Sequence, residues 1–385
     1  MRDRLLALFI CAAALLAGGC ATHDRLKNPG TSWPPSPGVT AHRGASALRP
    51  EHTLEAYRKA IEDGADSIEP DLVATRDGVL VARHENEISG TTDVAARPEF
   101  AGRKTRKTID GVLVDGWFTE DFTLAELKRL RARERIPANR PGSAAYDGRF
   151  AIPTLQEIVD LVARASRARK RPIGLVPELK HPTYFQSIGL PLEARLVDAL
   201  KANGYRGRDA AVFIQSFEVA NLKALQALAG YRLVQLVGAP GEAPYDAVAA
   251  GSALTYADMI TPAGLADIAR YAAVVAPHKS IVIPRDGADM PGAPTRFVRD
   301  AHAAGLAVHV WTMRPENPFL PASLRRAPVG APGVRGDAVG EIRAFLDAGV
   351  DAVFTDDPAT GRDAVDAFIR QRDSAQPAPT TSTSR

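Results

Sequence analysis

The sequence predicts an α/β protein whose parallel strands close into an eight-stranded TIM (β/α)8 barrel. Short apolar segments alternate with segments of helical periodicity from residue 38 to about residue 370. Alternation of this kind favours a parallel sheet with crossover helices. The length agrees, because such a barrel needs about 250 residues and its loops add more.

The strand candidates are short apolar runs bounded by polar residues, Gly or Pro. About nine of them compete for the eight places in a barrel. The ambiguity lies between residues 273 and 283, where two runs, 273–276 and 280–283, follow each other closely. The candidates are 38–42, 67–74, 79–83, 172–178, 211–215, 232–237, one within 273–283, 307–311 and 352–355.

The helix candidates show apolar residues at helical spacing between these strands. The first, 54–63, has a capping residue, Thr53, before it and Gly64 after it, which are typical start and stop signals. The others are 154–168, 191–202, 217–229, 294–304 and 340–348.

One block interrupts this alternation. Residues 86–150 follow the third strand candidate and are rich in Gly, Pro and Arg. They are too many for a plain connection, so they predict an inserted subdomain beside the site. Within the block, Thr123 is the predicted cap of a helix at 124–132.

The amino terminus has the form of a secretory signal. Arg2 and Arg4 precede an apolar run at 5–17, which is shorter than the ~20 residues of a membrane span. Small residues follow it, up to Cys20. We therefore expect a signal peptide at 1–19, a flexible tether at 20–37, a barrel domain at 38–370 and a disordered tail at 371–385.

The end of the signal, Leu16-Ala17-Gly18-Gly19-Cys20, also resembles a bacterial lipobox. The resemblance implies a lipid anchor on Cys20, and Ala21 after it implies the periplasmic side of the outer membrane of a Gram-negative bacterium. Ordinary cleavage near Cys20, which leaves a soluble periplasmic protein, is the alternative. Cys11 leaves with the signal, so the mature chain has no cysteine pair to oxidise.

The composition is that of an ordinary globular protein. The chain has 385 residues, of which 45% are hydrophobic and 24% charged, and its formal net charge is +3. These values indicate an ample core. They give no indication of a nucleic-acid partner.

The polar residues that carry chemistry follow the strand candidates. Glu69 and Asp71 are two apart on one strand, so their side chains share a face. Two carboxylates on one face repel each other unless a cation lies between them, and a hard divalent cation prefers oxygen ligands. Glu178, at the end of another strand, is a third candidate ligand, and Lys180 shares its face.

Two histidines, His42 and His84, also follow strands beside this carboxylate pair. Histidines transfer protons near neutral pH, and Arg43 beside them is a candidate phosphate contact. In this barrel class the carboxyl ends of the strands form the site. Each residue has a structural alternative: ion pairing for the charged groups and packing for the histidines.

Several motifs together resemble the glycerophosphodiester phosphodiesterase family, and the match covers nearly everything between residues 39 and 369. The motif Pro50-Glu51-His52-Thr53, with histidine and not asparagine at its third position, resembles the periplasmic branch of that family. The matching residues are His42-Arg43-Gly44, Pro50-Glu51-His52-Thr53, Glu69-Pro70-Asp71-Leu72, Thr75 to Val79, His84, Pro177-Glu178-Leu179-Lys180, Gln215-Ser216-Phe217, Trp311-Thr312 and Phe354-Thr355-Asp356-Asp357-Pro358.

The resemblance implies hydrolysis of small glycerophosphodiesters to glycerol 3-phosphate and an alcohol. It implies His42 and His84 as acid and base, and calcium as the metal on the three carboxylates, with magnesium as the second choice. It implies phosphate contacts from Arg43 and Lys180. The resemblance also implies a role for Glu51 at substrate hydroxyls or ligands, and Trp311 is a candidate wall of the glycerol pocket, with a packed core position as its alternative.

Two other functions stay open at this point. One is a lysophospholipase D-like or other lipid phosphodiesterase, which an apolar groove formed by the 86–150 block would support. The other is an anchored ligand-binding lipoprotein that uses the barrel as a scaffold. The sequence assigns no role to His52, and it favours loop capping for Asp356 and Asp357.

Overall fold

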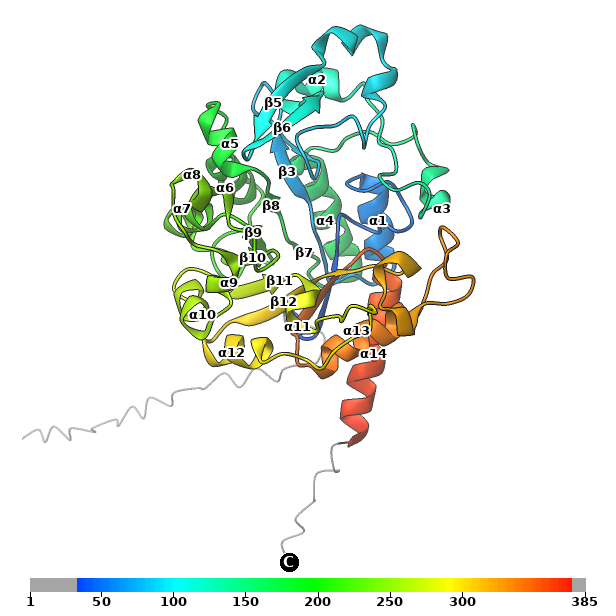
Figure 1. The fold of residues 1–385 in the computed structure, drawn as a ribbon. Coiled ribbons are helices and arrows are strands. Elements are labelled where there is room, and N and C mark those ends of the chain that lie inside the picture. The colour runs from blue at the N-terminus through cyan, green and yellow to red at the C-terminus, as the bar shows by residue number, and fades with distance from the viewer. Residues whose placement is uncertain (1–32, 376–385) are drawn as a thin grey trace, which may run out of the picture. The chain divides into compact units, whose positions relative to one another are not determined.

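The computed structural model describes residues 33–375 (Figure 1). The predicted signal peptide, Cys20 and most of the predicted tether lie outside the described residues. The last helix, α14 (Pro358–Ala375), extends five residues into the predicted tail. The rest of that tail, residues 376–385, also lies outside the described residues.

Eight strand positions form a closed parallel ring. Two of them are interrupted: β2 (Ser67–Ile68) continues as β3 (Asp71–Ala74), and β7 (Gly174–Leu175) continues as β8 (Glu178–Leu179). The ring closes because the last strand pairs in parallel with the first. The others are β1 (Gly38–Ala41), β9 (Phe213–Ser216), β10 (Arg232–Val237), β11 (Val274–Pro277), β12 (Ala307–Met313) and β13 (Ala352–Thr355).

The strand at the third candidate position lies outside this ring. It is β4 (Leu80–Ala82), and it pairs antiparallel with β3. Counted by ring strands, the insertion that follows β4 therefore lies between the second and third barrel strands. The ambiguity at 273–283 is also resolved: 274–277 is the barrel strand, and α11 (Lys279–Val282) is a helix.

Helices surround the ring (Figure 1). The first begins as predicted, since the hydroxyl of Thr53 accepts a hydrogen bond from the amide of Ala56 at 3.1 Å. The helices outside the insertion are α1 (Leu54–Glu62), α4 (Leu155–Arg169), α5 (Pro182–Ser187), α6 (Glu193–Ala202), α7 (Val219–Ala229), α8 (Tyr245–Ala249), α9 (Tyr256–Met259), α10 (Pro262–Ile268), α11, α12 (Phe297–Ala303), α13 (Ala338–Asp347) and α14, with two short 3-10 turns, η4 (Asn317–Phe319) and η5 (Ala322–Leu324).

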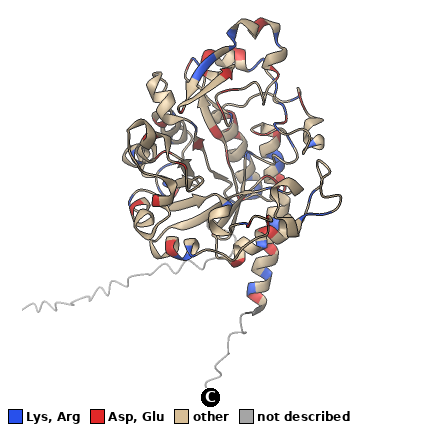
Figure 2. Cartoon of the chain, viewed as in Figure 1, with Lys and Arg blue, Asp and Glu red and all other residues tan. Residues whose placement is uncertain are grey.

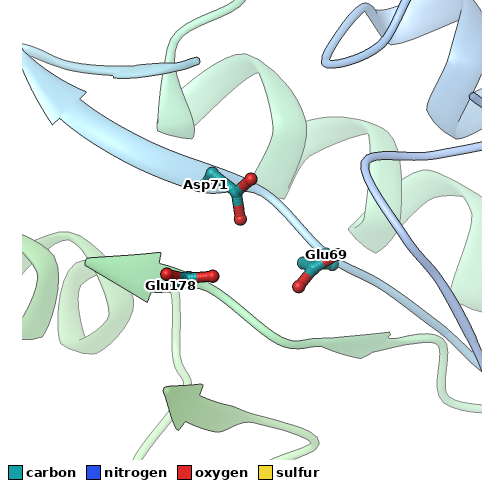
Figure 3. Close-up of side chains that lie close together, drawn as sticks. All are labelled: Glu69, Asp71 and Glu178. Atoms are coloured by element: carbon teal, nitrogen blue, oxygen red, sulfur yellow. The ribbon is translucent and has the colours of Figure 1, made fainter. Parts of the chain in front are cut away.

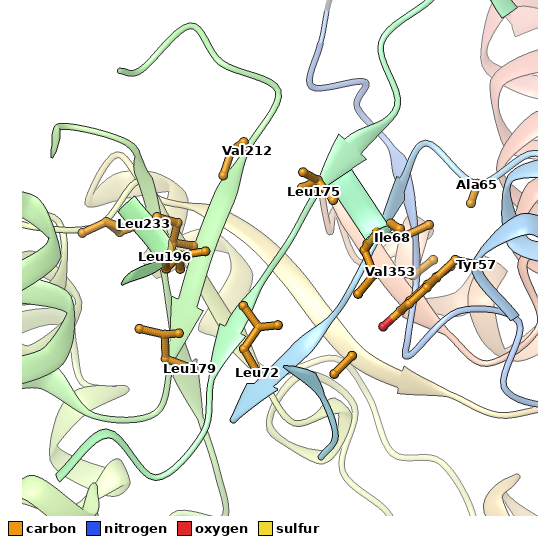
Figure 4. Packing of buried hydrophobic residues seen from close by; sticks show 14 of the residues in the cluster. Tyr57, Ala65, Ile68, Leu72, Leu175, Leu179, Leu196, Val212, Leu233 and Val353 are labelled. Atoms are coloured by element: carbon orange, nitrogen blue, oxygen red, sulfur yellow. The ribbon is translucent and has the colours of Figure 1, made fainter. Parts of the chain in front are cut away.

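The core has two layers because side chains alternate along each strand. The outer layer packs between strands and helices and includes Ile68, Leu72, Leu175 and Leu179 (Figure 4). The inner layer fills the barrel. It consists of Val176, Phe213, Val234, Leu236, Val274, Ala276 and Phe354. The alternation that buries Leu72 outside places its neighbour Asp71 on the inner face.

The insertion is packed against the barrel. Phe100, Trp117 and Phe122 are buried in the same cluster as the outer layer. Its helix α2 (Leu124–Leu127) has the predicted Thr123 cap but ends five residues earlier than predicted. The other elements are η1 (Val94–Ala96), η2 (Pro98–Arg103), the hairpin β5 (Thr105–Ile109) and β6 (Val112–Gly116), η3 (Thr119–Asp121) and α3 (Pro141–Ala144).

Charges of both signs are spread over the described chain. Figure 2 shows both signs interspersed along α14, whereas in the β5–β6 hairpin the basic residues are on β5 and the acidic one is on β6. Among residues 33–375, no helix has the length and apolar character needed to span a membrane.

Candidate active site

The turn after β1 brings His42 and Arg43 to the carboxyl end of the barrel. Arg43 has φ 60°, and Gly44 after it has φ 88°. A Cβ at Gly44 would lie 2.8 Å from the backbone carbon of Ala56, so both the turn and the close approach of α1 require glycine. The turn also aims the amide of Arg43 at Oε2 of Glu69, 3.2 Å away.

Three buried carboxylates face one another inside the ring (Figure 3). Glu69 comes from the break between β2 and β3, and Asp71 and Glu178 begin β3 and β8. Each offers an oxygen within 4.8 Å of the others. Oδ1 of Asp71 is buried and has no hydrogen-bond partner in the described chain. An all-oxygen set with an unpaired inner oxygen fits a hard divalent cation.

The electrostatics of this group reflect its crowding. Burial, with the nearby charges of Asp71 and Glu178, raises the pKa of Glu69 well above its usual range. Burial also raises the pKa of Glu178 to about 7. Burial acts in the same direction on Asp71, but Lys180 and His52 hold the pKa of that carboxyl well below its usual range. Three carboxylates therefore crowd an interior in which Arg43 and Lys180 are close to them, and a divalent cation would relieve their repulsion.

The two predicted phosphate contacts border the carboxylates. Nζ of Lys180 lies 2.6 Å from Oε1 of Glu178. Nε of Arg43 lies 3.5 Å from Oδ2 of Asp71, and its Nη1 donates to Oε2 of Glu51 at 3.2 Å. Both cations are less than a tenth exposed, so an anion in the site would meet them with little competition from water.

Each predicted catalytic histidine has a carboxylate on its Nδ1 atom. Nδ1 of His42 lies 2.5 Å from Asp356, and Nδ1 of His84 lies 2.5 Å from Glu85. A carboxylate only accepts, so each Nδ1 carries the proton and each Nε2 is the free base. Burial lowers the pKa of His42 to about 4 and that of His84 to about 3, which leaves both neutral near pH 7.

These side chains meet at a cavity of about 70 Å³. It opens beside a groove of about 960 Å³, with which it shares His84, Glu178, Lys180, Phe217 and Trp311. The cavity is lined by His42, Arg43, Glu69, His84, Glu178, Lys180, Phe217, Leu236, Trp311, Thr312, Arg314 and Phe354.

The sequence profile of the glycerophosphoryl diester phosphodiesterase family matches residues 42–360. The chain belongs to this family. It is 34% identical to a glycerophosphodiester phosphodiesterase of Arabidopsis thaliana over 75% of this chain and 77% of that protein. It is 27% identical to one of Haemophilus influenzae over 94% of this chain and 98% of that protein. The prediction of an enzyme of this class is confirmed.

Solved structures agree on the fold. A phosphodiesterase of this type from Silicibacter pomeroyi aligns with a TM-score of 0.61 at 21% identity, covering 88% of this chain and 96% of that one. One from Oleispira antarctica, solved with the product sn-glycerol-3-phosphate, aligns with a TM-score of 0.55 at 23% identity, covering 86% and 97%. The predicted TIM barrel is therefore confirmed.

The structure shows whether two of the predicted site residues, Glu51 and Trp311, line the cavity. Glu51 does not line the cavity, because its carboxylate lies between Arg43 and Arg135 of the insertion. Trp311 does line the cavity, and its indole Nε1 donates to the carbonyl of Ala276 at 2.9 Å. Its ring meets Phe217 edge-on, with centroids 5.7 Å apart, which forms an aromatic wall.

Other residues of the site were missed or given another role. His52 is fully buried and lies 2.9 Å from Asp71 through Nε2 and 2.7 Å from Tyr57 through Nδ1. The loop-capping hypothesis is wrong for Asp356, whose carboxylate faces His42 and not the backbone of its loop. It holds for Asp357, which accepts from the amide of Thr360. The position of His52 within the motif Pro50-Glu51-His52-Thr53 is the local sequence feature that could have indicated its place in the site.

Proposed function

We propose that the chain hydrolyses glycerophosphodiesters to glycerol 3-phosphate and an alcohol by two-histidine acid–base catalysis at a metal site. The supporting observation is a single cavity bordered by two neutral histidines and lined by Arg43, Lys180 and members of the acidic triad. The triad is Glu69, Asp71 and Glu178. Family membership supports the substrate class, and the bound product of the Oleispira antarctica protein agrees with it.

In the first step, the 2-hydroxyl of the glycerol attacks phosphorus. The new P–O bond forms as the bond to the leaving alcohol breaks, which gives a cyclic 1,2-phosphate. One histidine accepts the hydroxyl proton at Nε2. The other, neutral at rest, first takes up a proton from solvent at its Nε2 and donates it to the leaving oxygen. Arg43 and Lys180 hold the phosphate through charge-assisted hydrogen bonds. Water then opens the ring with the proton roles reversed.

The acidic triad would hold calcium, with magnesium as the second choice. Its oxygen-only donors and the unpaired Oδ1 of Asp71 support a hard cation. When bound, such an ion lowers the pKa of a coordinated hydroxyl and offsets negative charge that develops on phosphorus. Glu51 would act from behind Arg43, holding that guanidinium in place while Trp311 walls the glycerol end.

A direct assay tests this function. Glycerophosphocholine should release glycerol 3-phosphate and choline, and an analogue that lacks the 2-hydroxyl should not react, because no ring can form. Arg97→Met is a suitable control variant, since among residues 33–375 the side chain of Arg97 pairs only with Asp93 of the insertion, and neither residue lines the cavity. Turnover of the deoxy analogue at a comparable rate would contradict the cyclic route.

The groove beside the cavity favours a second candidate, a lysophospholipase D-like activity. Val112 of the hairpin and Val248 of α8 are 64% and 53% exposed and face this groove. Its other apolar members are Leu179, Pro182, Phe217, Ala239, Ala243, Tyr245, Tyr256 and Trp311. An apolar groove that continues from the cavity fits a substrate with an acyl chain.

A pair of neighbouring valine and leucine residues separates the two candidates. Val112 lines the groove, whereas Leu113, 63% exposed, does not. If lysophosphatidylcholine is a substrate, Val112→Asp should reduce its turnover and spare glycerophosphocholine, and Leu113→Asp should change neither. No turnover of lysophosphatidylcholine by the unaltered enzyme would exclude the second candidate.

The predicted lipid anchor on Cys20 stays a proposal that the sequence supports. It would hold the enzyme at the periplasmic face of the outer membrane, where glycerophosphodiesters and lysophospholipids are both accessible. Mass spectrometry of the native amino terminus should find a diacylglycerol-modified Cys20, and Cys20→Ser should release the protein. An unmodified amino terminus downstream of Cys20 would contradict the anchor and leave the enzyme proposal unchanged.

A further inference from the structure

Two arginines of the insertion, Arg135 and Arg140, bond the carboxylates that contact the two histidines. Arg135 grips Glu85 with two bonds, Nη1 to Oε1 at 3.0 Å and Nη2 to Oε2 at 2.7 Å. Glu85 in turn bonds Nδ1 of His84 at 2.5 Å. We call His84, Glu85 and Arg135 the outer arm of the site.

Arg140 holds the second of these carboxylates, Asp356, through one bond and not two. It bonds Oδ2 of Asp356 through Nη2, Oε1 of Glu316 through Nε at 2.6 Å, and the carbonyl of Ser46 through Nη1 at 3.0 Å. Oδ1 of Asp356 bonds Nδ1 of His42. We call His42, Asp356 and Arg140 the inner arm.

We propose that Arg135 and Arg140 are positioning residues, each of which fixes the carboxylate that orients one catalytic histidine. The 86–150 insertion thereby completes the acid–base machinery of the barrel. This inference rests on the proposed function of His42 and His84. It assigns the insertion a role in turnover that is separate from any contact with the substrate.

The chemistry of the pairs supports this role. A carboxylate held by one imidazole alone can rotate and release the ring. The guanidinium fork of Arg135 fixes the plane of Glu85. Arg140 bonds the oxygen of Asp356 that faces away from His42, and Nε of Arg314 also lies 3.3 Å from that oxygen. The Glu85 side chain is 35% exposed, and its side-chain partners in the described chain are His84 and the fork of Arg135. Apart from the ring that it orients, Glu85 is therefore restrained by Arg135. Histidine orientation matters because a displacement of about 1 Å can cost roughly a hundredfold in rate.

Arg135 also contacts Glu51, so the test must separate an effect through Glu51 from an effect through Glu85. Its Nε and Nη2 also bond Oε2 and Oε1 of Glu51, at 3.0 and 2.7 Å, and Glu51 holds Arg43. Action through Glu51 would weaken phosphate binding and raise KM. Action through Glu85 would misplace His84 and lower kcat.

The kinetic test compares single and double variants on glycerophosphocholine. Arg135→Met and Arg140→Met should each lower kcat at least roughly tenfold with a smaller change in KM. Arg97→Met, which breaks an insertion ion pair of similar exposure (35% against 31% for Arg135), should change neither. Arg135→Lys should recover little, because an ammonium lacks the fork.

Double variants show which histidine each arginine serves. Arg135→Met should cost almost nothing further once His84→Ala is present, and Arg140→Met almost nothing further beside His42→Ala, because groups that act as a unit are non-additive. Full additivity in both pairs, or a change confined to KM, would overturn the proposal. If Arg140→Met does not fold, Arg135→Met beside His84→Ala decides the proposal by itself.

A spectroscopic readout keeps this inference distinct from the proposed function. In protein with 15N-labelled histidine, Arg135→Met should shift the ring signals of His84 and leave those of His42, and Arg140→Met should do the reverse. Unchanged ring signals in both variants would overturn the positioning role. If His42→Ala and His84→Ala keep near-normal turnover, the proposed function fails, while the ring signals still decide what the arginines hold.

Discussion

The inner and outer arms have the same chemical order but very different surroundings. His42, Asp356 and Arg140 have side chains that are 10%, 2% and 5% exposed. The corresponding values for His84, Glu85 and Arg135 are 29%, 35% and 31%. The inner arm joins the barrel strands β1 and β13, whereas the outer arm follows the edge strand β4. Because of this difference in burial, substitutions in the two arms are expected to have similar effects on turnover but different effects on stability.

The largest expected effect is common to both arms. Because Glu69 and Glu178 of the acidic triad line the same cavity as both histidines, removal of the metal with a chelator should lower turnover by roughly a hundredfold or more. Melting temperature should fall as well, since an ion that binds only the folded state stabilises it by mass action. Calcium should restore both. Full turnover in excess chelator after dialysis would contradict the metal assignment.

The next effect should distinguish the arms by stability. Arg140→Met removes the guanidinium that Asp356 and Glu316 share in the interior, and Asp356 keeps only Arg314 nearby, with Nε 3.3 Å from Oδ2. Breaking a buried pair costs about 3–5 kcal/mol. Arg135→Met breaks a pair that water partly screens, so about 1 kcal/mol is expected. Urea unfolding of the two variants measures the difference. Equal losses would show that the contrast in burial has no energetic consequence.

The smallest effect concerns a histidine outside both arms. His309 lies in the barrel beside Phe213, and burial lowers its pKa to about 4. Between about pH 6.5 and pH 4 the unfolded chain therefore binds more protons than the folded chain. The contribution of His309 to the free energy of unfolding is full above pH 6.5 and is lost as pH falls through that window. The stability lost by pH 5 amounts to about 2 kcal/mol.

His309→Gln should accordingly flatten the acid side of the stability profile between pH 7 and pH 5 in urea unfolding, with little change in turnover. His309 shares a lowered pKa with His42 and His84, but Nδ1 of His309 has no hydrogen-bond partner in the described chain. A large loss of turnover in this variant would contradict the view that His42 and His84 differ in function from a buried histidine without a carboxylate partner.

Local pattern was enough to predict the parts of the site that lie on strands. The two-residue spacing of Glu69 and Asp71, and of Glu178 and Lys180, sets which side chains share a face, and the barrel brings the faces together. The same reasoning misjudged less periodic segments. A four-residue apolar run such as 280–283 is compatible with strand or helix, and there the structure has the helix α11.

The arms were not predictable in the same way. Arg140 lies 216 positions before Asp356 and Arg135 lies 50 positions after Glu85, so no short sequence window contains either pair. Asp356 and Asp357 are adjacent and chemically identical, yet only Asp356 faces a histidine. Which of two such neighbours turns inward depends on the packing of β13 and α14 against the rest of the barrel.

Turnover of glycerophosphocholine by His42→Ala and His84→Ala, each compared with the unaltered enzyme and with Arg97→Met, tests the central claim most directly. If both histidines transfer protons, each substitution should lower kcat by roughly a hundredfold or more. Folding should be preserved, because residues at the strand ends are not part of the packed core. Near-normal kcat in both variants would contradict the two-histidine account and leave these residues a purely structural role.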